Sequence, residues 1–256
     1  KKKEQAPLKI VINSTYGMCK DKYSQAYDPR QANLICLNGQ LMLVDLIEHL
    51  EAIPGFELIQ SNTDGLIVSI PDTDAAFDMM DDICYEWETR CNMELEFDQI
   101  SSIHQKDVNN YVFTFINGDL EKKGKYVKEL NPLDYDLPIV NKALVDYMVY
   151  NVPVEETINN CNDLIMFQKI VKLTGKYEYM EHNNKKYHYK CYRVFASNGD
   201  DGSIFKCRDG KLSKVGDTPV SCFIYNENVT DVKVPKKLDR NWYIELAKKR
   251  LNDFGC

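Results

Sequence analysis

The sequence has no uninterrupted apolar stretch of the roughly 18 to 20 residues that a membrane-spanning helix needs. Its first five residues, Lys1 to Gln5, also lack the apolar segment of a secretory signal peptide. Nine cysteines are spread widely over the 256 residues, but no Cys-x-x-Cys pair occurs, so the spacing of a zinc ribbon or a thioredoxin motif is missing. We therefore expect no membrane contact and a reducing, cytoplasmic location, in the host cell if the source is viral. Because residue 1 is not methionine, we expect the chain to be part of a longer protein.

An excess of positive charge, which marks general nucleic-acid binders, is also missing, since the net charge is −7. The charge is uneven along the chain. Residues 1–129 carry 13 Lys and Arg against 22 Asp and Glu, whereas residues 130–256 carry 19 against 17. An acidic part joined to a mildly basic part suits an enzyme that holds divalent metals beside a polyanion, although many other proteins share this asymmetry.

Hydrophobic periodicity predicts an α+β protein with an antiparallel sheet covered on one face by helices. In the first half we expect helices over residues 7–18, 31–50 and 74–90, a hairpin of strands 56–61 and 66–70, and further strands over 93–97, 111–115 and 125–127. In the second half we expect helices over 139–150, 154–161 and 241–254, with small strands between residues 170 and 226. Asp239 is expected to cap the last of these helices.

The first candidate site is a polar stripe on the first predicted helix. Lys9, Asn13 and Tyr16 are spaced i, i+4 and i+7, so they share one helix face. A lysine neutralises phosphate, an amide bonds to a base or sugar edge, and a tyrosine packs on either, so the stripe suits a phosphorylated ligand. Spacing alone favours the plainer interpretation, an ordinary helix with a surface lysine and a buried tyrosine.

The second candidate is Asp64, in the turn Asn62-Thr63-Asp64-Gly65 between two apolar strands. A carboxylate at the tip of a hairpin is held rigidly and can be presented to a metal ion. The alternative is a polar turn in which the aspartate only favours the turn geometry.

Together the two segments resemble family B DNA polymerases, and among them those of bacterial viruses. Residues 9–17 match the KxxxNSxYG signature of that family at every specified position. A lysine ahead of Tyr-Gly also fits the bacterial repair-type polymerases, but Asn13-Ser14 points to family B. The turn at residues 62–65 falls where the YxDTDS hairpin of the family is expected, after a helix similar to its palm helix.

The match departs from the family at several positions. Asn62 replaces the first Asp of the DTD triplet, and Gln60 replaces the aromatic residue two positions before it. The KxY element that contacts the primer is matched by Tyr111, with Asn109 at the lysine position and Lys106 as a possible substitute. No DxxSLYPS-like segment, which carries the other catalytic aspartate, occurs in the sequence.

The resemblance implies the end of the fingers at residues 1–30, a palm at 31–129 and a mixed helical and β thumb at 130–256. It implies a DNA-directed DNA polymerase that adds deoxynucleoside triphosphates to a primer–template through two Mg²⁺ ions. Asp64 would be the catalytic metal ligand, Lys9 would neutralise the triphosphate, and Asn13 and Tyr16 would line the nucleotide. DNA contacts would come from Tyr111, Lys106 and Asn109, and from thumb lysines such as Lys169, Lys172, Lys176, Lys185 and Lys186.

Because one carboxylate does not hold two Mg²⁺ ions, we expect this chain alone to be inactive without the N-terminal remainder of the polymerase. Two alternatives stay open. The first is a non-catalytic DNA- or protein-binding module derived from a polymerase palm and thumb, which Asn62 and Gln60 favour. The second is an unrelated α+β enzyme with a fortuitous Asn-Ser-Thr-Tyr-Gly.

Overall fold

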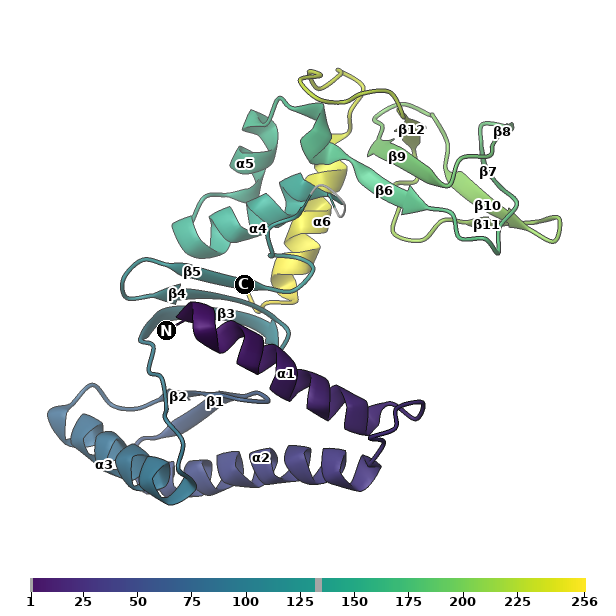
Figure 1. Ribbon diagram of the computed structural model, residues 1–256. Coiled ribbons are helices and arrows are strands. Elements are labelled where there is room, and N and C mark those ends of the chain that lie inside the picture. The colour runs from purple at the N-terminus through teal and green to yellow at the C-terminus, as the bar shows by residue number, and fades with distance from the viewer. Residues whose placement is uncertain (1, 132–134) are drawn as a thin grey trace. The chain divides into compact units, whose positions relative to one another are not determined.

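The computed structural model describes residues 2–131 and 135–256, with side chains from residue 7 onward (Figure 1). The chain is an α+β protein with antiparallel strands in several sheets, as the sequence predicts. It divides into two compact units, unit 1 (Lys1–Phe97) and unit 2 (Asp98–Cys256). The expected domain boundaries at residues 30 and 130 do not coincide with this division. The assignment of fingers, palm and thumb to parts of the chain stays a prediction.

Unit 1 consists of three helices and one hairpin. In chain order these are α1 (Lys2–Lys20), α2 (Pro29–Leu50), β1 (Glu57–Ser61), β2 (Leu66–Ser69) and α3 (Asp74–Cys91). Asp28 caps the N-terminus of α2 by accepting hydrogen bonds from the backbone N–H groups of Arg30 and Gln31. Pro29 occupies the first turn, where a backbone N–H has no partner within the helix, so that its missing N–H costs nothing. The helix and hairpin predictions for this unit are therefore confirmed.

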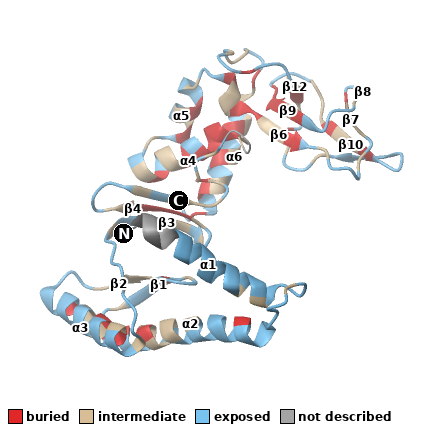
Figure 2. Ribbon diagram, in the orientation of Figure 1, coloured by how far each residue is buried: buried red, intermediate tan, exposed pale blue. Residues whose placement is uncertain are grey.

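The core of unit 1 lies between α2 and α3. Its buried residues are Leu46, Leu50, Ile53, Ala76, Cys84 and Trp87. Trp87 donates its indole N–H to the backbone oxygen of Met42 at 3.1 Å, and Arg90 forms an ion pair with Asp45 at 2.6 Å. These contacts fix α3 against the C-terminal half of α2. By contrast, most of α1 and the first half of α2 are exposed (Figure 2).

Unit 2 begins with the three-stranded antiparallel sheet β3 (Ile100–Asp107), β4 (Asn110–Phe115) and β5 (Leu120–Lys123). Helices α4 (Pro138–Tyr150) and α5 (Val154–Asn160) follow. The last helix is α6 (Arg240–Asn252). Asp239 caps its N-terminus, because its carboxylate accepts hydrogen bonds from the backbone N–H groups of Asn241 and Trp242. This cap is the one that the sequence predicts.

Two further sheets lie between α5 and α6. The first has the strand order β12–β9–β6, and the second has the order β11–β10–β7–β8. Their strands are β6 (Lys169–Lys172), β7 (Tyr179–His182), β8 (Lys185–Tyr187), β9 (Cys191–Ala196), β10 (Ile204–Arg208), β11 (Lys211–Lys214) and β12 (Cys222–Ile224). The predicted small strands between residues 170 and 226 are confirmed.

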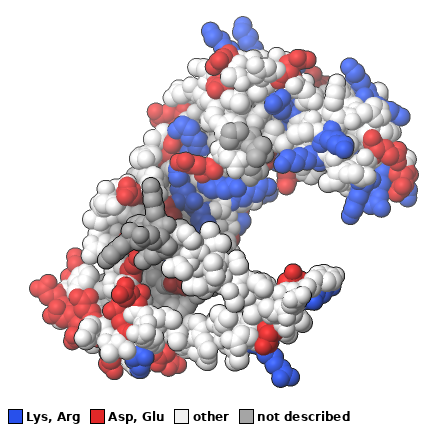
Figure 3. All heavy atoms as spheres, in the orientation of Figure 1, with Lys and Arg blue, Asp and Glu red and all other residues white. Residues whose placement is uncertain are grey.

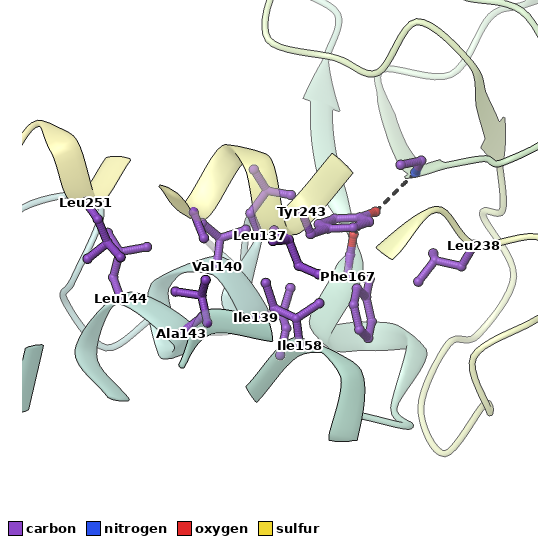
Figure 4. Close-up of a cluster of buried hydrophobic side chains, with 14 of the residues drawn as sticks. Leu137, Ile139, Val140, Ala143, Leu144, Ile158, Phe167, Leu238, Tyr243 and Leu251 are labelled. Atoms are coloured by element: carbon purple, nitrogen blue, oxygen red, sulfur yellow. Dashed lines mark hydrogen bonds between the residues drawn. The ribbon is translucent and has the colours of Figure 1, made fainter. Parts of the chain in front are cut away.

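The main core of unit 2 gathers α4, α5 and α6 around Tyr243 and Phe167 (Figure 4). Phe167 belongs to a short 3₁₀ helix, Leu164–Phe167. Both aromatic rings are fully buried, with centroids 5.1 Å apart and an edge-to-face angle of 81°. This geometry is a favourable arrangement for an aromatic pair. The packing of these helices around the two rings therefore forms the main core of unit 2.

Two strand predictions are wrong. Residues 93–97 alternate apolar and acidic side chains but form no strand. Instead the preceding Asn92 ends α3 at a φ of 52°, and the N–H of Leu95 donates to the carboxylate of Glu88, which ties the segment back to the helix. Residues 125–127 lie in a turn, because the N–H groups of Val127 and Lys128 both donate to the oxygen of Gly124.

The hairpin β1–β2 and the sheet β3–β4–β5 are separate sheets in the described part of the chain, and they belong to different units. The sequence predicted one sheet from these strands. Each sheet has its own strand pairing. In the first, β1 pairs with β2 from Glu57 opposite Ser69 to Ser61 opposite Leu66. In the second, β4 pairs with β3 on one side and with β5 on the other.

Candidate functional site

The polar stripe lies on a continuous helix, as its spacing predicts. Lys9 and Asn13 are exposed on α1 and make no hydrogen bond or ion pair with the described side chains. Tyr16 is half-buried, and its hydroxyl contacts the sulfur of Cys36 on α2 at 3.1 Å. The tyrosine is therefore anchored against the second helix, whereas the lysine and the asparagine are free to meet a ligand.

The stripe extends by one residue beyond the KxxxNSxYG pattern. Lys20 follows Tyr16 at a spacing of four residues, and its ammonium nitrogen lies 5.2 Å from the centroid of the Tyr16 ring. The hydrogen bond with Tyr16 raises the pKa of Lys20 above its usual value. Continuing the same i, i+4 spacing would have found it. The face thus carries a cation at each end.

Asp64 occupies the turn of the hairpin β1–β2, in the same unit as α1. The turn is closed by the N–H of Asn62, which donates to the oxygen of Gly65 at 2.9 Å, and the side chain of Asn62 accepts the N–H of Thr63 at 2.8 Å. Asp64 itself is exposed and makes no hydrogen bond or ion pair within the described residues. Asn62 therefore builds the turn, and the carboxylate of Asp64 is left for another partner.

Gln60 lies on β1, ahead of the turn, at the position where the family has an aromatic residue. Only 6% of its surface is exposed, and its side-chain oxygen has no hydrogen-bond partner within the described residues. A buried acceptor without a donor destabilises the fold. The position is therefore built to bury a side chain, and a glutamine is an unfavourable occupant.

The predicted primer-contacting residues lie on the hairpin β3–β4 of unit 2. Tyr111 is buried, stacks on Phe113 with centroids 3.9 Å apart, and donates its hydroxyl to Glu121 at 2.7 Å. Asn109 is exposed in the turn, where its N–H donates to Asp107. These contacts order the hairpin, and the DNA-contacting role of Tyr111 and Asn109 stays a prediction.

Lys106 lies on β3 and is also occupied within unit 2. Its ammonium nitrogen forms an ion pair with Asp253 at 3.2 Å and lies 5.0 Å from the centroid of Tyr126. A DNA phosphate would have to compete with this carboxylate. Lys106 is thus a weaker candidate for a phosphate contact than Lys9.

On the face drawn in Figure 3, acidic side chains gather over α3, and many lysines and arginines are visible over unit 2. Of the five predicted thumb lysines, Lys169 is paired with Asp136 at 2.9 Å, and Lys186 lies 4.5 Å from the centroid of the Tyr179 ring. The charge asymmetry counted in the sequence is visible on the face of the molecule that Figure 3 shows.

Within residues 2–131 and 135–256, no three or more His, Cys, Asp or Glu side chains come close enough to hold a metal ion. The exposed carboxylate of Asp64 is the oxygen donor that Mg²⁺ takes, but it is one donor of the several that the ion needs. Asp64 therefore fits Mg²⁺ as one member of a ligand set.

None of the helices in the described residues is long and apolar enough to cross a bilayer. In comparisons with known proteins, no family model matches the chain, and no curated protein matches it.

Proposed function

We propose that this chain is part of a template-directed DNA polymerase that extends a primer 3′ end with deoxynucleotides. The observation that carries the proposal is the stripe on α1. Lys9, Asn13 and Tyr16 fill the KxxxNSxYG pattern on one unbroken helix, and Lys9 and Asn13 have no hydrogen-bond or ion-pair partner among the described residues. An exposed lysine and an exposed asparagine on the same face as an anchored tyrosine suit a phosphorylated ligand, and the full KxxxNSxYG match is what favours this over an ordinary surface helix.

The chemistry assigned to each residue follows from its contacts. The primer hydroxyl attacks the α-phosphate of the incoming nucleotide, and pyrophosphate leaves. Lys9 places a free ammonium beside the triphosphate, and Lys20 adds a second charge at the other end of the stripe. Tyr16 is held by Cys36 in one orientation, so that its ring can line the sugar or base. Positioning and charge neutralisation of this kind supply most of the catalysis in phosphoryl transfer.

Asp64 contributes a carboxylate to the metal site in this proposal. When bound, Mg²⁺ would neutralise the charge that develops on the phosphate oxygens. Asp64 would hold the ion from the rigid hairpin turn, and the remaining carboxylate would come from the N-terminal remainder of the polymerase. We therefore expect the 256-residue chain alone to show no Mg²⁺-dependent primer extension, and incorporation by it would contradict this view.

The exposed apolar residues of α1 support a missing neighbour. Leu8, Ile10, Val11 and Ile12 are each more than 60% exposed. Apolar surface of this kind marks a protein–protein contact. We assign the contact to the remainder of the polymerase, which would also bring the second catalytic aspartate.

Nucleotide kinetics test the role of Lys9 directly. In the longer polymerase, Lys9→Ala should lower kcat/KM for the nucleotide about ten- to a hundredfold, because a charged contact to phosphate is worth roughly 1.5 to 3 kcal/mol. Lys22→Ala is the matched control, since Lys22 is exposed in the turn after α1 and does not belong to the stripe. Equal kinetics for both variants would refute the assignment.

The alternative of a non-catalytic binding module is favoured by one observation, the buried Gln60 in place of the aromatic residue. Such a module would bind primer–template DNA in a salt-dependent manner without incorporating nucleotides. Binding without incorporation by the full-length protein would select it over the polymerase.

A further inference from the structure

A cavity of about 480 Å³ opens on the outer face of the sheet β12–β9–β6 in unit 2. The register places Ile170 opposite Arg193, and Lys172 opposite Cys191. Directly paired residues of an antiparallel sheet point to the same face, as do residues two apart on one strand. These four side chains therefore share the floor of the cavity. The residues that alternate with them face the core, and they are Val171, Tyr192 and Val194.

Arg193 is held in a fixed orientation at this floor. Its Nε donates to the side-chain oxygen of Gln168 at 3.1 Å, and its Nη1 donates to the backbone oxygens of Asn226 and Glu227 at 3.2 and 3.3 Å. Gln168 is 4% exposed and donates in turn to the backbone oxygen of Tyr135 at 2.7 Å. The Nη2 group has no partner among the described residues. The guanidinium is thus pre-organised by a buried side chain, with donors left for a ligand.

Lys172 adds a second positive charge to the cavity floor. Its neighbour on the same strand, Lys169, forms an ion pair with Asp136 at 2.9 Å, whereas Lys172 is exposed and has no ion pair within the described residues. Glu227 is the carboxylate in the lining. Two cations against one anion leave the cavity selective for a negatively charged group.

Aromatic rings complete the lining. Tyr189 is 65% exposed, and its ring contacts the buried ring of Tyr192 at 6.1 Å between centroids. Tyr135 also lines this cavity. A solvent-accessible ring beside two cations offers a surface for stacking a base and donors for its phosphate. The cavity volume also lies within the roughly 300 to 1,000 Å³ of small-molecule sites.

We propose that this cavity binds a nucleoside 5′-phosphate, either as a free nucleotide or as one residue of a single strand. Arg193 and Lys172 bind the phosphate, and Tyr189 stacks on the base. The site lies within unit 2 and uses neither the stripe on α1 nor Asp64. It shares only Lys172 with the residues expected to contact DNA, and its test needs no nucleotide incorporation, so the two proposals can fail separately.

Cys191 provides a direct probe because it is exposed and lies on the cavity floor. The alkylation rate of each cysteine by iodoacetamide can be followed by peptide mass spectrometry in the intact chain. Cys256 is also exposed and belongs to unit 2, so it serves as the internal reference. At thymidine 5′-monophosphate concentrations about ten times the dissociation constant, Cys191 should react about tenfold more slowly, while Cys256 keeps its rate.

Variants separate the phosphate contacts from general charge. Lys172→Gln and Arg193→Lys should each raise the half-protecting concentration about tenfold, because a charged hydrogen bond contributes roughly 1.5 kcal/mol or more. Lys211→Gln removes the same charge from an exposed residue of β11 and should change nothing. Lys172 is exposed, so its replacement leaves the fold intact.

The ligand series identifies the source. Protection by the free monophosphate supports a nucleotide site, and protection by an oligothymidylate alone supports a site for a strand. Absence of protection by both would overturn the proposal. Equal protection by inorganic phosphate, or an unchanged half-protecting concentration in Lys172→Gln, would overturn it as well.

Discussion

The hydroxyl of Tyr243 joins α6 to two other parts of the core of unit 2, and its removal should be costly. It donates to the backbone oxygen of Phe167 at 2.7 Å and accepts the backbone N–H of Ala196 at 3.1 Å (Figure 4). The residue is fully buried. Tyr243→Phe keeps the ring and deletes one oxygen atom, so the packing term is nearly unchanged.

The magnitude follows from the two backbone groups left behind. Each loses its partner in a place that water does not reach, and a buried group without a partner costs about 1 to 3 kcal/mol. We therefore expect Tyr243→Phe to lower the free energy of unfolding by about 3 kcal/mol, in the lower half of the combined range of about 2 to 6 kcal/mol. For a unit of this size, this loss corresponds to a decrease in Tm of about 6 to 12 °C.

Tryptophan fluorescence can report on unit 2 alone. The chain has two tryptophans, Trp87 in unit 1 and Trp242 beside Tyr243, so a Trp87→Phe background leaves a single reporter. Urea denaturation of Tyr243→Phe should then show a lower midpoint with an unchanged slope. Tyr150→Phe is the matched control, because Tyr150 is 61% exposed, and its change should stay within about 0.5 kcal/mol.

The same residue predicts a pH dependence. Burial raises the pKa of Tyr243 above its usual 10.0, so the folded state keeps a proton that the unfolded state loses above that pH. The stabilising contribution is complete below pH 10 and decreases as the pH rises further. Tyr243→Phe should remove this decrease. If Tyr243→Phe loses no more stability than Tyr150→Phe, and its alkaline profile matches the wild type, the reasoning is refuted.

Three other substitutions test separate parts of the structure. Gln60→Met should stabilise unit 1 by about 1 kcal/mol, because it removes a buried acceptor without a donor, and an unchanged urea midpoint followed by Trp87 fluorescence would count against this. Gly124→Ala should destabilise unit 2 by about 2 kcal/mol or more, because φ is +102° and the added Cβ would lie 2.7 Å from the backbone oxygen of Asn109. Gly175→Ala is the control and should be nearly neutral in the same urea assay, because no atom lies within 4 Å of its added Cβ. Burial raises the pKa of Cys222 from 9.0 to about 11, so unfolding free energy should fall by on the order of 2 kcal/mol between pH 9 and 11 in the wild type, and less in Cys222→Ala; parallel profiles would contradict this.

The sequence predicts most helices and turns because their signals are local. Asp239 and the residues around Asn62 act within a few positions, and the structure bears both out. The prediction of a strand at residues 93–97 is wrong because alternation alone does not supply a partner strand. Instead the N–H of Leu95 donates a hydrogen bond to the carboxylate of Glu88. Which strands share a sheet is decided by contacts between distant residues, which periodicity does not encode.

The candidate site shows the same division. The shared face of Lys9, Asn13 and Tyr16 follows from helix geometry, and so does the extension to Lys20. The burial of Tyr111 and its hydrogen bond to Glu121 on the neighbouring strand, by contrast, involve contacts between strands, which spacing does not reveal. The floor of the cavity in unit 2 could not be predicted from the sequence either, because its residues come from two paired strands about twenty positions apart.

Primer extension by the longer polymerase carrying Asp64→Asn tests the central claim most directly. Asp64 is exposed and makes no hydrogen bond or ion pair within the described residues, so its replacement should leave the fold and DNA binding nearly unchanged. Thr63→Ala in the same turn is the control and should keep its activity. The account predicts that Asp64→Asn abolishes nucleotide incorporation with Mg²⁺, and synthesis at the wild-type rate would contradict it.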